Sequence, residues 1–184
     1  MNSNWIFCFC DFETTGIDYD ESLPIEVGCV FTNAKFDVLN TYESMIMWPK
    51  LSKVFRWPDW AEKAYEFHHI TIQEYLEKAM PNDIVCDKIA QICRSVNFVK
   101  ENRNVILISD NAAFEFNFMR RMFKQAKMEF PFHYCAWDTS LLLEITGVCD
   151  PPGKHVLHRA LADASQLHKY VIRSLERVGY FDKK

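Results

Sequence analysis

Three short apolar runs, separated by polar segments, occupy the first part of the chain. They cover residues 5–10, 24–31 and 40–48 and are rich in Trp, Ile, Val, Phe and Tyr, which favour extended backbone. Apolar runs of this length, bounded by turn residues such as those at 14–16, are typical of buried strands. Because short turns join them, the pattern predicts three strands in an antiparallel meander.

Apolar residues at three- and four-residue spacing then predict helices that alternate with two further strands. Thr71 with Glu74 has the pattern of a capping box, and Asn82 or Asp83 is a candidate cap for a helix ending near Val96. The remaining predicted segments are a loop at 55–60 leading into a short helix through 67, a strand at 105–108, a helix at 112–127, a strand edge at 135–139, a short helix at 141–145, a break at 150–154 and a final helix from about 158 to 177. This order predicts an α/β fold in which helices flank a mixed five-stranded sheet, in a single domain over residues 1–184.

The composition excludes several classes of protein. A hydrophobic content of 49% with only 5 Gly indicates a packed core and not a disordered chain. No segment approaches the roughly 18 to 20 apolar residues of a membrane span, and the N-terminus lacks the basic region of a signal peptide. The 7 cysteines include no C-x-x-C pair, which favours reduced thiols. We therefore expect a cytoplasmic protein with no membrane partner.

The charge is spread without a strong excess. A net charge of −4 argues against a protein that coats nucleic acid by charge alone, but not against an enzyme that holds a strand end through metal ions. Arg120, Lys124 and Lys127 share one face of a predicted helix. A solvated face is the simpler interpretation of these cations, and a track for phosphates is the alternative.

The first strand leads into two carboxylates, Asp11 and Glu13, separated by one residue. Side chains alternate along a strand, so both carboxylates point the same way. Two adjacent carboxylates beside a core repel each other, and a bound divalent cation would compensate for their charge. Oxygen ligands suit Mg²⁺ or Mn²⁺. The alternative is a strand that runs out into a solvated acidic turn.

Three further polar residues adjoin apolar helix faces. Asp163 lies on or beside the apolar stripe of the final helix, where it needs a cation, several donors or a salt bridge. His158 stands at the start of that helix and can face the same cavity from the loop, or can be an ordinary surface residue. Glu115 begins the apolar stripe of another helix, where favouring the helix dipole is the simpler role.

Taken together, three segments resemble the exonuclease motifs of the DEDDh 3′-5′ exonuclease family. They are Asp-Phe-Glu-Thr-Thr-Gly at 11–16, Asn-Ala-Ala-Phe-Glu at 111–115 and His-Arg-Ala-Leu-Ala-Asp at 158–163. The family includes the proofreading subunit of bacterial replicative polymerase, ribonuclease T and oligoribonuclease. The resemblance implies a ribonuclease H-like fold and two-metal-ion hydrolysis that releases nucleoside monophosphates from the 3′ end of DNA or RNA.

The resemblance also implies roles for the residues that match the motifs. Asp11 would bridge two divalent cations, Mg²⁺ or Mn²⁺, and Glu13 and Asp163 would hold the cation on the side of the nucleophile. Glu115 would help to hold the other cation, through water. His158 would take the proton of the attacking water, for which an imidazole is suited.

Other matching positions are assigned to a single-stranded 3′ end. Thr14 and Thr15 would hold the terminal sugar and phosphate, and His68 would approach the terminal nucleotide. Asn111 belongs to the second motif, and Phe114 is a candidate for stacking on a base. The sequence leaves DNA and RNA both open as substrates.

Two positions depart from the family pattern. Glu115 stands where the family has Asp, with Asp110 as a conceivable substitute, and His69 stands where the family has Gly. The first departure supports an alternative function, a catalytically weak module that binds nucleic-acid ends or docks on a polymerase or repair complex. A homodimer is also compatible with the sequence.

Overall fold

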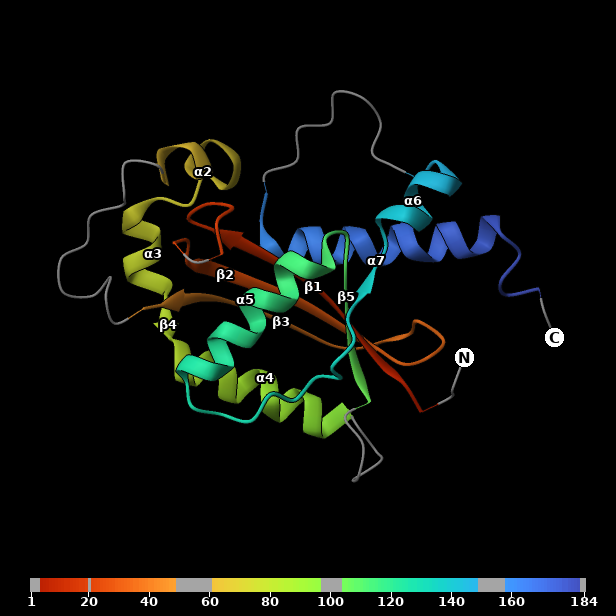
Figure 1. Ribbon diagram of the computed structural model, residues 1–184, viewed down its shortest axis with the longest axis horizontal. Helices are drawn as coiled ribbons and strands as arrows, with labels where there is room; N and C mark the ends of the chain where they lie inside the picture. The colour runs from red at the N-terminus through yellow and green to blue at the C-terminus, as the bar shows by residue number, and fades with distance from the viewer. Residues whose placement is uncertain (1–3, 20, 49–60, 97–103, 149–157, 183–184) are drawn as a thin grey trace.

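The computed structural model describes residues 4–19, 21–48, 61–96, 104–148 and 158–182, and their chain forms a six-stranded sheet with helices on both faces (Figure 1). The strands are β1 (Ile6–Thr14), β2 (Pro24–Thr32), β3 (Val38–Met47), β4 (Met80–Pro81), β5 (Val105–Ser109) and β6 (Trp137–Asp138), in the order β4-β3-β2-β1-β5-β6. The first three pair antiparallel, as the meander predicts, and the other pairs are parallel. The predicted mixed α/β class is confirmed.

The sixth strand, β4, adds to the five that the sequence predicts. Its two residues, Met80 and Pro81, lie beside Ile46 and Met47 at the end of β3. Two residues are too few to produce a hydrophobic alternation, and proline lacks the backbone N–H of a ladder. The sequence therefore carries no signal for this strand.

The helices match the predicted segments with shifts of a few residues at their ends. They are α2 (Ala61–His68), α3 (Ile72–Lys78), α4 (Asn82–Val96), α5 (Ala112–Gln125), α6 (Ser140–Thr146) and α7 (Ala160–Arg177). Thr71 is confirmed as the N-cap of α3, because its hydroxyl accepts from the Glu74 N–H at 3.1 Å; the Glu74 carboxylate instead accepts from Lys78 at 3.0 Å. The predicted loop at 55–60 and the break at 150–154 lie outside the described residues. Across the segments described, no helix has the length and apolarity to span a bilayer.

Two apolar clusters, one on each face of the sheet, decide where the carboxylates of β1 point. Cys8 and Cys10 belong to the cluster under α4 and α5, whereas Phe7 and Phe9 pack with α7. By alternation, Asp11 and Glu13 continue the α7 face. β1 continues beyond the apolar run through both carboxylates, as the main interpretation predicts, because it stays paired with β2 through Thr14. The two carboxylates therefore lie within a rigid strand and not in a turn.

Candidate active site

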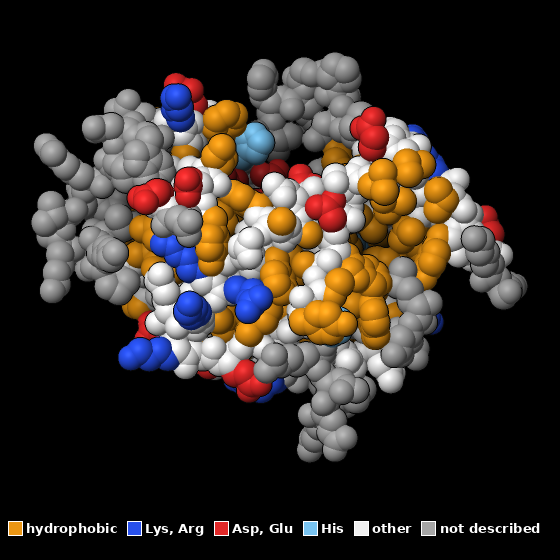
Figure 2. Space-filling view, in the orientation of Figure 1, with side chains coloured by type: hydrophobic (Ala, Val, Ile, Leu, Met, Phe, Trp, Pro, Cys, Tyr) orange, Lys and Arg blue, Asp and Glu red, His pale blue; other side chains and the backbone are white. Residues whose placement is uncertain are grey.

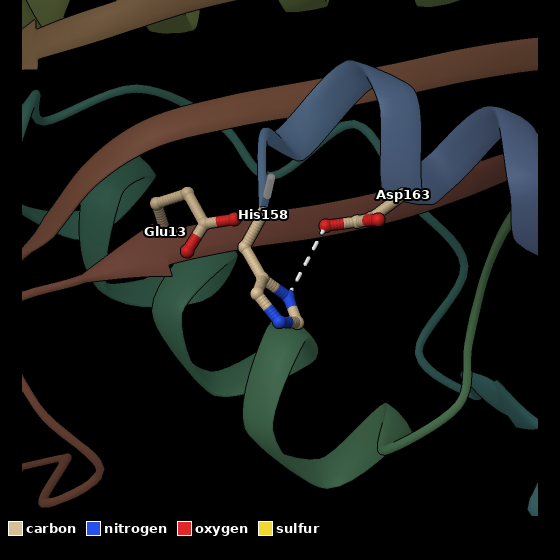
Figure 3. A group of neighbouring side chains, drawn as sticks. All are labelled: Glu13, His158 and Asp163. Carbon is tan, nitrogen blue, oxygen red and sulfur yellow. Dashed lines mark ion pairs between the residues drawn. The ribbon is translucent and has the colours of Figure 1, made fainter. Parts of the chain in front are cut away.

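Three of the predicted site residues meet at the start of α7. Single ligand atoms of Glu13, His158 and Asp163 all lie within 4.8 Å of one another. Figure 3 shows Glu13 on β1, Asp163 on α7 and His158 just before that helix. The Nδ1 atom of His158 lies 3.6 Å from Oδ2 of Asp163. Segments that are far apart in the sequence thus bring two carboxylates and an imidazole together.

The other two predicted ligands, Asp11 and Glu115, line the same cavity. This cavity has a volume of about 480 Å³ and is bounded by Asp11, Phe12, Glu13, Ile17, Asn111, Phe114, Glu115, His158 and Asp163. Asp11 and Glu115 are outside the tight group of ligand atoms among the described residues. All four predicted carboxylates nevertheless face one space.

The carboxylates of β1 are destabilised as anions. Desolvation raises the pKa of Asp11 well above its ordinary value, and the charges of Glu13 and Asp163 raise it further. Burial raises the pKa of Glu13 to about 8, assisted by Asp163 and by Glu26 on the neighbouring strand. Such a set of oxygen donors fits a divalent cation, whose charge would allow all of them to ionise.

Glu115, the departure from the family pattern, has a fixed partner. Its Oε2 accepts a hydrogen bond of 2.8 Å from the Ser109 hydroxyl at the end of β5, and both side chains are buried. Burial raises the pKa of Glu115 to about 7, and the Ser109 bond opposes this rise. Asp110, the conceivable substitute, lines an adjacent cavity of about 500 Å³ together with Asp11, His158 and Asp163, and this cavity does not include Glu115. Glu115 and Asp110 thus both lie near Asp11, and of the two only Glu115 shares a cavity with Asp11, Glu13 and Asp163 among the described residues.

A partly buried ion pair holds the start of α7 against β2, and the sequence analysis missed it. Glu26 is 1% exposed, and it accepts from Nη2 of Arg159 at 2.7 Å and from the backbone N–H of Ala160 at 3.0 Å. A Cβ at Gly28 would lie 2.1 Å from the carbonyl carbon of Ala160, so only glycine permits this close approach. A lone Glu within the apolar run 24–31 was the signal available in the sequence. Glu26, Gly28 and Arg159 thereby position His158 and Asp163.

The two threonines after Glu13 have different surroundings. Thr14 lines a cavity of about 630 Å³ beside the carboxylates, and its hydroxyl donates to the Gly16 carbonyl at 2.7 Å. Thr15 is 2% exposed, and its hydroxyl accepts from the Leu23 N–H at 2.9 Å. Thr14 can therefore contact a ligand, whereas the Thr15 hydroxyl closes the turn at 15–23.

His68 also lines the 630 Å³ cavity, and its imidazole is neutral at pH 7. Its Nδ1 accepts from the Ile70 N–H at 2.9 Å, and burial lowers its pKa to about 4. His69, which replaces the family's Gly, has φ of 53°. This is the left-handed region that favours glycine. The loop thus keeps a glycine-like backbone at His69 despite the substitution.

The second motif places its polar and aromatic residues at the start of α5. The N–H of Ala112 is capped by Asp138 of β6 at 3.0 Å, while Asn111 makes no side-chain capping bond. Asn111 and Phe114 instead line the carboxylate cavity. Phe114 packs edge-on against Phe118 with ring centroids 4.7 Å apart. The capping role of Asp138 is a further residue function that the sequence analysis missed.

The mixed sheet thus brings carboxylates together from its central strand and from the start of a covering helix. The sequence model of the RNase T exonuclease family matches residues 8–170. The match spans most of the chain, so the chain belongs to this exonuclease family. The recognition as a DEDDh-type 3′-5′ exonuclease, and with it the enzyme class, is confirmed at the level of the family.

Solved structures of exonuclease I share the fold. The structure of E. coli exonuclease I in complex with a dT13 oligonucleotide has a TM-score of 0.71 and 15% identity over 97% of this chain and 43% of that one. The zinc-bound complex of E. coli exonuclease I with single-stranded DNA has a TM-score of 0.69 and 16% identity, over 95% of this chain and 41% of that one. Exonuclease I from Methylocaldum szegediense has a TM-score of 0.62 and 14% identity, over 94% of this chain and 40% of that one. The chain spans less than half of these proteins. No curated protein matches it in sequence.

Proposed function

We propose that residues 1–184 form one exonuclease domain that removes nucleoside monophosphates from single-stranded 3′ ends of DNA or RNA. The observation that carries the proposal is the convergence of Asp11, Glu13, Glu115 and Asp163 on one cavity, with His158 at its edge. Membership of the exonuclease family supports the reaction class. Hydrolysis adds negative charge at the phosphate, so a site with this function needs compensating cations.

The four carboxylates would hold two divalent cations, Mg²⁺ or Mn²⁺. Asp11 is flanked by the other three, since the charges of Glu13, Asp163 and Glu115 all raise its pKa, and it would bridge the two cations. Glu13 and Asp163 would hold one of them, and Glu115 would help to hold the other. When bound, the cations would stabilise the charge of the attacking and leaving oxygens.

His158 is the proposed base. Its Nδ1 faces Asp163 at 3.6 Å, so a proton on Nδ1 leaves the basic lone pair on Nε2. The side chain is 54% exposed and can reach a water beside the carboxylates. Nε2 would take the proton of the attacking water, while Asp163 holds the ring orientation.

The 630 Å³ cavity beside the carboxylates is the proposed place of the terminal nucleotide. Thr14 and His68 line it, and Phe114 and Asn111 line the adjoining carboxylate cavity. We propose that Thr14 and His68 contact the terminal sugar and phosphate, and that Thr15 acts by closing the turn that presents Thr14. Phe114 is placed to stack on a base.

The test uses 5′-labelled single-stranded DNA and RNA of one sequence, incubated with Mg²⁺ or Mn²⁺. We expect products that shorten stepwise from the 3′ end and that disappear with EDTA or in the Asp11→Asn variant. Asp87→Asn, at an acid on α4 whose side chain is 48% exposed and which lines none of the cavities described above, is the matched control and should leave the ladder intact. Intact substrate under every metal condition would refute the activity, and it would favour the module that only binds or docks.

A further inference from the structure

A second concave surface lies on α5, and it is lined by cations. Arg120, Arg121 and Lys124, with Asn117 and Tyr19, border a cavity of about 430 Å³. None of the described residues that line it is a carboxylate, although the chain carries 25 acidic and 21 basic side chains. In Figure 2, blue side chains gather over α5, below a hollow that contains red side chains beside a histidine. A local excess of positive charge on an acidic chain needs an explanation.

The cations of this surface, which we call the α5 basic cavity, are partly pre-positioned. Arg121 donates from Nη1 to the carbonyls of Tyr19 and Ser22, both at 2.6 Å, and its guanidinium lies 5.7 Å from the Tyr19 ring centroid. Arg120 lies 5.7 Å from the ring centroid of Phe116. Arg120 and Lys124 are exposed and make no ion pair with a carboxylate in the described part of the chain. Their charge is thus available to an anionic ligand.

One stripe of α5 connects this cavity with the carboxylate site. Phe114, Asn117, Arg121 and Lys124 follow one another at spacings of three and four residues, so they share a helix face. Phe114 lines the carboxylate cavity, and the other three line the α5 basic cavity. At 1.5 Å per residue, Lys124 lies roughly 15 Å along the helix from Phe114. The two cavities are successive parts of one path.

The turn after β1 joins the same two sites from the opposite side. Ile17 borders the carboxylate cavity and Tyr19 borders the α5 basic cavity. Arg121 fixes this turn through its bonds to Tyr19 and Ser22. A nucleic-acid strand that leaves the carboxylate site between the turn after β1 and helix α5 would therefore next meet the cations of the α5 basic cavity.

We propose that the α5 basic cavity binds phosphates of a single-stranded nucleic acid a few nucleotides upstream of its 3′ end. This inference rests on the proposed exonuclease function, because it assumes that the 3′ end occupies the carboxylate site. Arg120 and Lys124 contact phosphates directly, and Arg121 supports the turn. Phosphate contacts carry no sequence or sugar information, so the surface serves DNA and RNA alike.

The test compares a dinucleotide, which fills only the carboxylate site, with strands of about 20 nucleotides that also reach α5. In the double variant Arg120→Gln/Lys124→Gln, the ratio of kcat/KM for the long strand to that for the dinucleotide should fall about tenfold at low salt. Binding of the long strand, measured by fluorescence anisotropy in EDTA, should show a salt slope smaller by about 1.4, the loss of two contacts. DNA and RNA strands should be affected alike.

The matched control removes two charges elsewhere. Lys169→Gln/Arg173→Gln changes exposed cations on α7 that line none of the cavities described above. It should leave both the length preference and the salt slope unchanged. An unaltered ratio and slope in the α5 double variant, with the dinucleotide cleaved, would overturn this inference alone. Failure of the unchanged protein to cleave any substrate would refute the proposed function, and the anisotropy slope would still decide the inference.

Discussion

Neighbouring charges act on the pKa of Glu13 in opposite directions. It is 8% exposed and lies opposite Glu26 across the β1–β2 pair, and the charges of Asp163 and Glu26 raise its pKa further. Arg159 acts in the other direction, but it is already paired with Glu26. Without a cation, the folded protein therefore holds Glu13 at a cost in stability whenever it ionises.

Replacing Glu13 with Gln should stabilise the metal-free protein at alkaline pH. The pKa of Glu13 is raised from 4.5 to about 8, so between these values the folded state keeps a proton that the unfolded state has lost. The free energy of unfolding consequently falls as the pH rises through this window. Glu13→Gln removes this fall, and in EDTA near pH 8.5 we expect a gain of up to about 5 kcal/mol in urea unfolding.

Glu176→Gln, at an exposed position on α7, is the control and should leave the free energy of unfolding nearly unchanged. Equal stability of Glu13→Gln and the unchanged protein at both ends of the pH window would show that Glu13 ionises without a cost in the folded state.

Ser109 sets the ionisation of Glu115 from the end of β5. The Ser109→Ala variant would leave Oε2 of Glu115 without the donor that lowers its pKa. We expect a loss of about 1 to 2 kcal/mol in stability and a shift of the acid limb of the kcat/KM profile to higher pH. Ser174→Ala is the control, because Ser174 is also buried and accepts from Thr146 at 2.8 Å. A profile shifted equally by both variants would contradict a specific role of Ser109.

At the scale of elements, the active site depends on where α7 begins. The helix starts directly over β2, with the backbone of Ala160 against Gly28 and its N–H bonded to Glu26. Arg159 also reaches Glu74 on α3 at 3.4 Å, so α7 is tied to two elements at once. The positions of His158 and Asp163 follow from this contact.

A methyl group at Gly28 should therefore impair both stability and activity. The Gly28→Ala side chain would meet the backbone of Ala160 and push α7 away from β2. We expect a stability loss of about 3 kcal/mol and a fall in kcat of on the order of 100-fold, since displacements near 1 Å have such effects. Thermal unfolding and steady-state kinetics measure the two effects.

The control for this variant is Val27→Ala, which destabilises the same strand differently, by leaving a cavity on its opposite face. It should lose similar stability while retaining most of its activity at a temperature where both variants are folded. Normal kcat in Gly28→Ala would show that the start of α7 tolerates displacement.

The same elements show what a sequence can predict. The apolar run of β1, the N-cap at Thr71 and the stripe that carries Asp163 are local patterns, and the structure has each of them. The hydrogen-bonded ion pair between Glu26 and Arg159 joins residues 133 positions apart, so no local sequence pattern predicts it. The extension of β1 through Thr14 likewise depends on its partner β2. Local patterns could not predict contacts between distant segments; the convergence of Asp11, Glu13, Glu115 and Asp163 was implied only by the resemblance to the exonuclease family.

At the scale of the whole molecule, the stability of the fold, the protonation of the cavity carboxylates and the affinity for cations depend on one another. Asp11, Glu13 and Glu115 all have raised pKa values, with about 8 for Glu13 and about 7 for Glu115. A cation that binds only the folded state stabilises it, by about 2.7 kcal/mol at a concentration 100 times its Kd. Because the cation must displace the bound protons, its affinity should rise with pH.

We therefore expect Mg²⁺ or Mn²⁺ to raise the Tm, and this rise to grow between about pH 6 and pH 8.5 as Glu115 and Glu13 lose their protons. NaCl of equal ionic strength controls for screening, and Asp11→Asn should abolish most of the increase. Calorimetric titration at the higher pH should give two cations per chain and proton release that diminishes towards alkaline pH. A rise in Tm that is independent of pH, or that persists in Asp11→Asn, would place the cation away from these carboxylates. Such a result would separate cation binding from the arrangement of β1 and α7 that supports the proposed reaction.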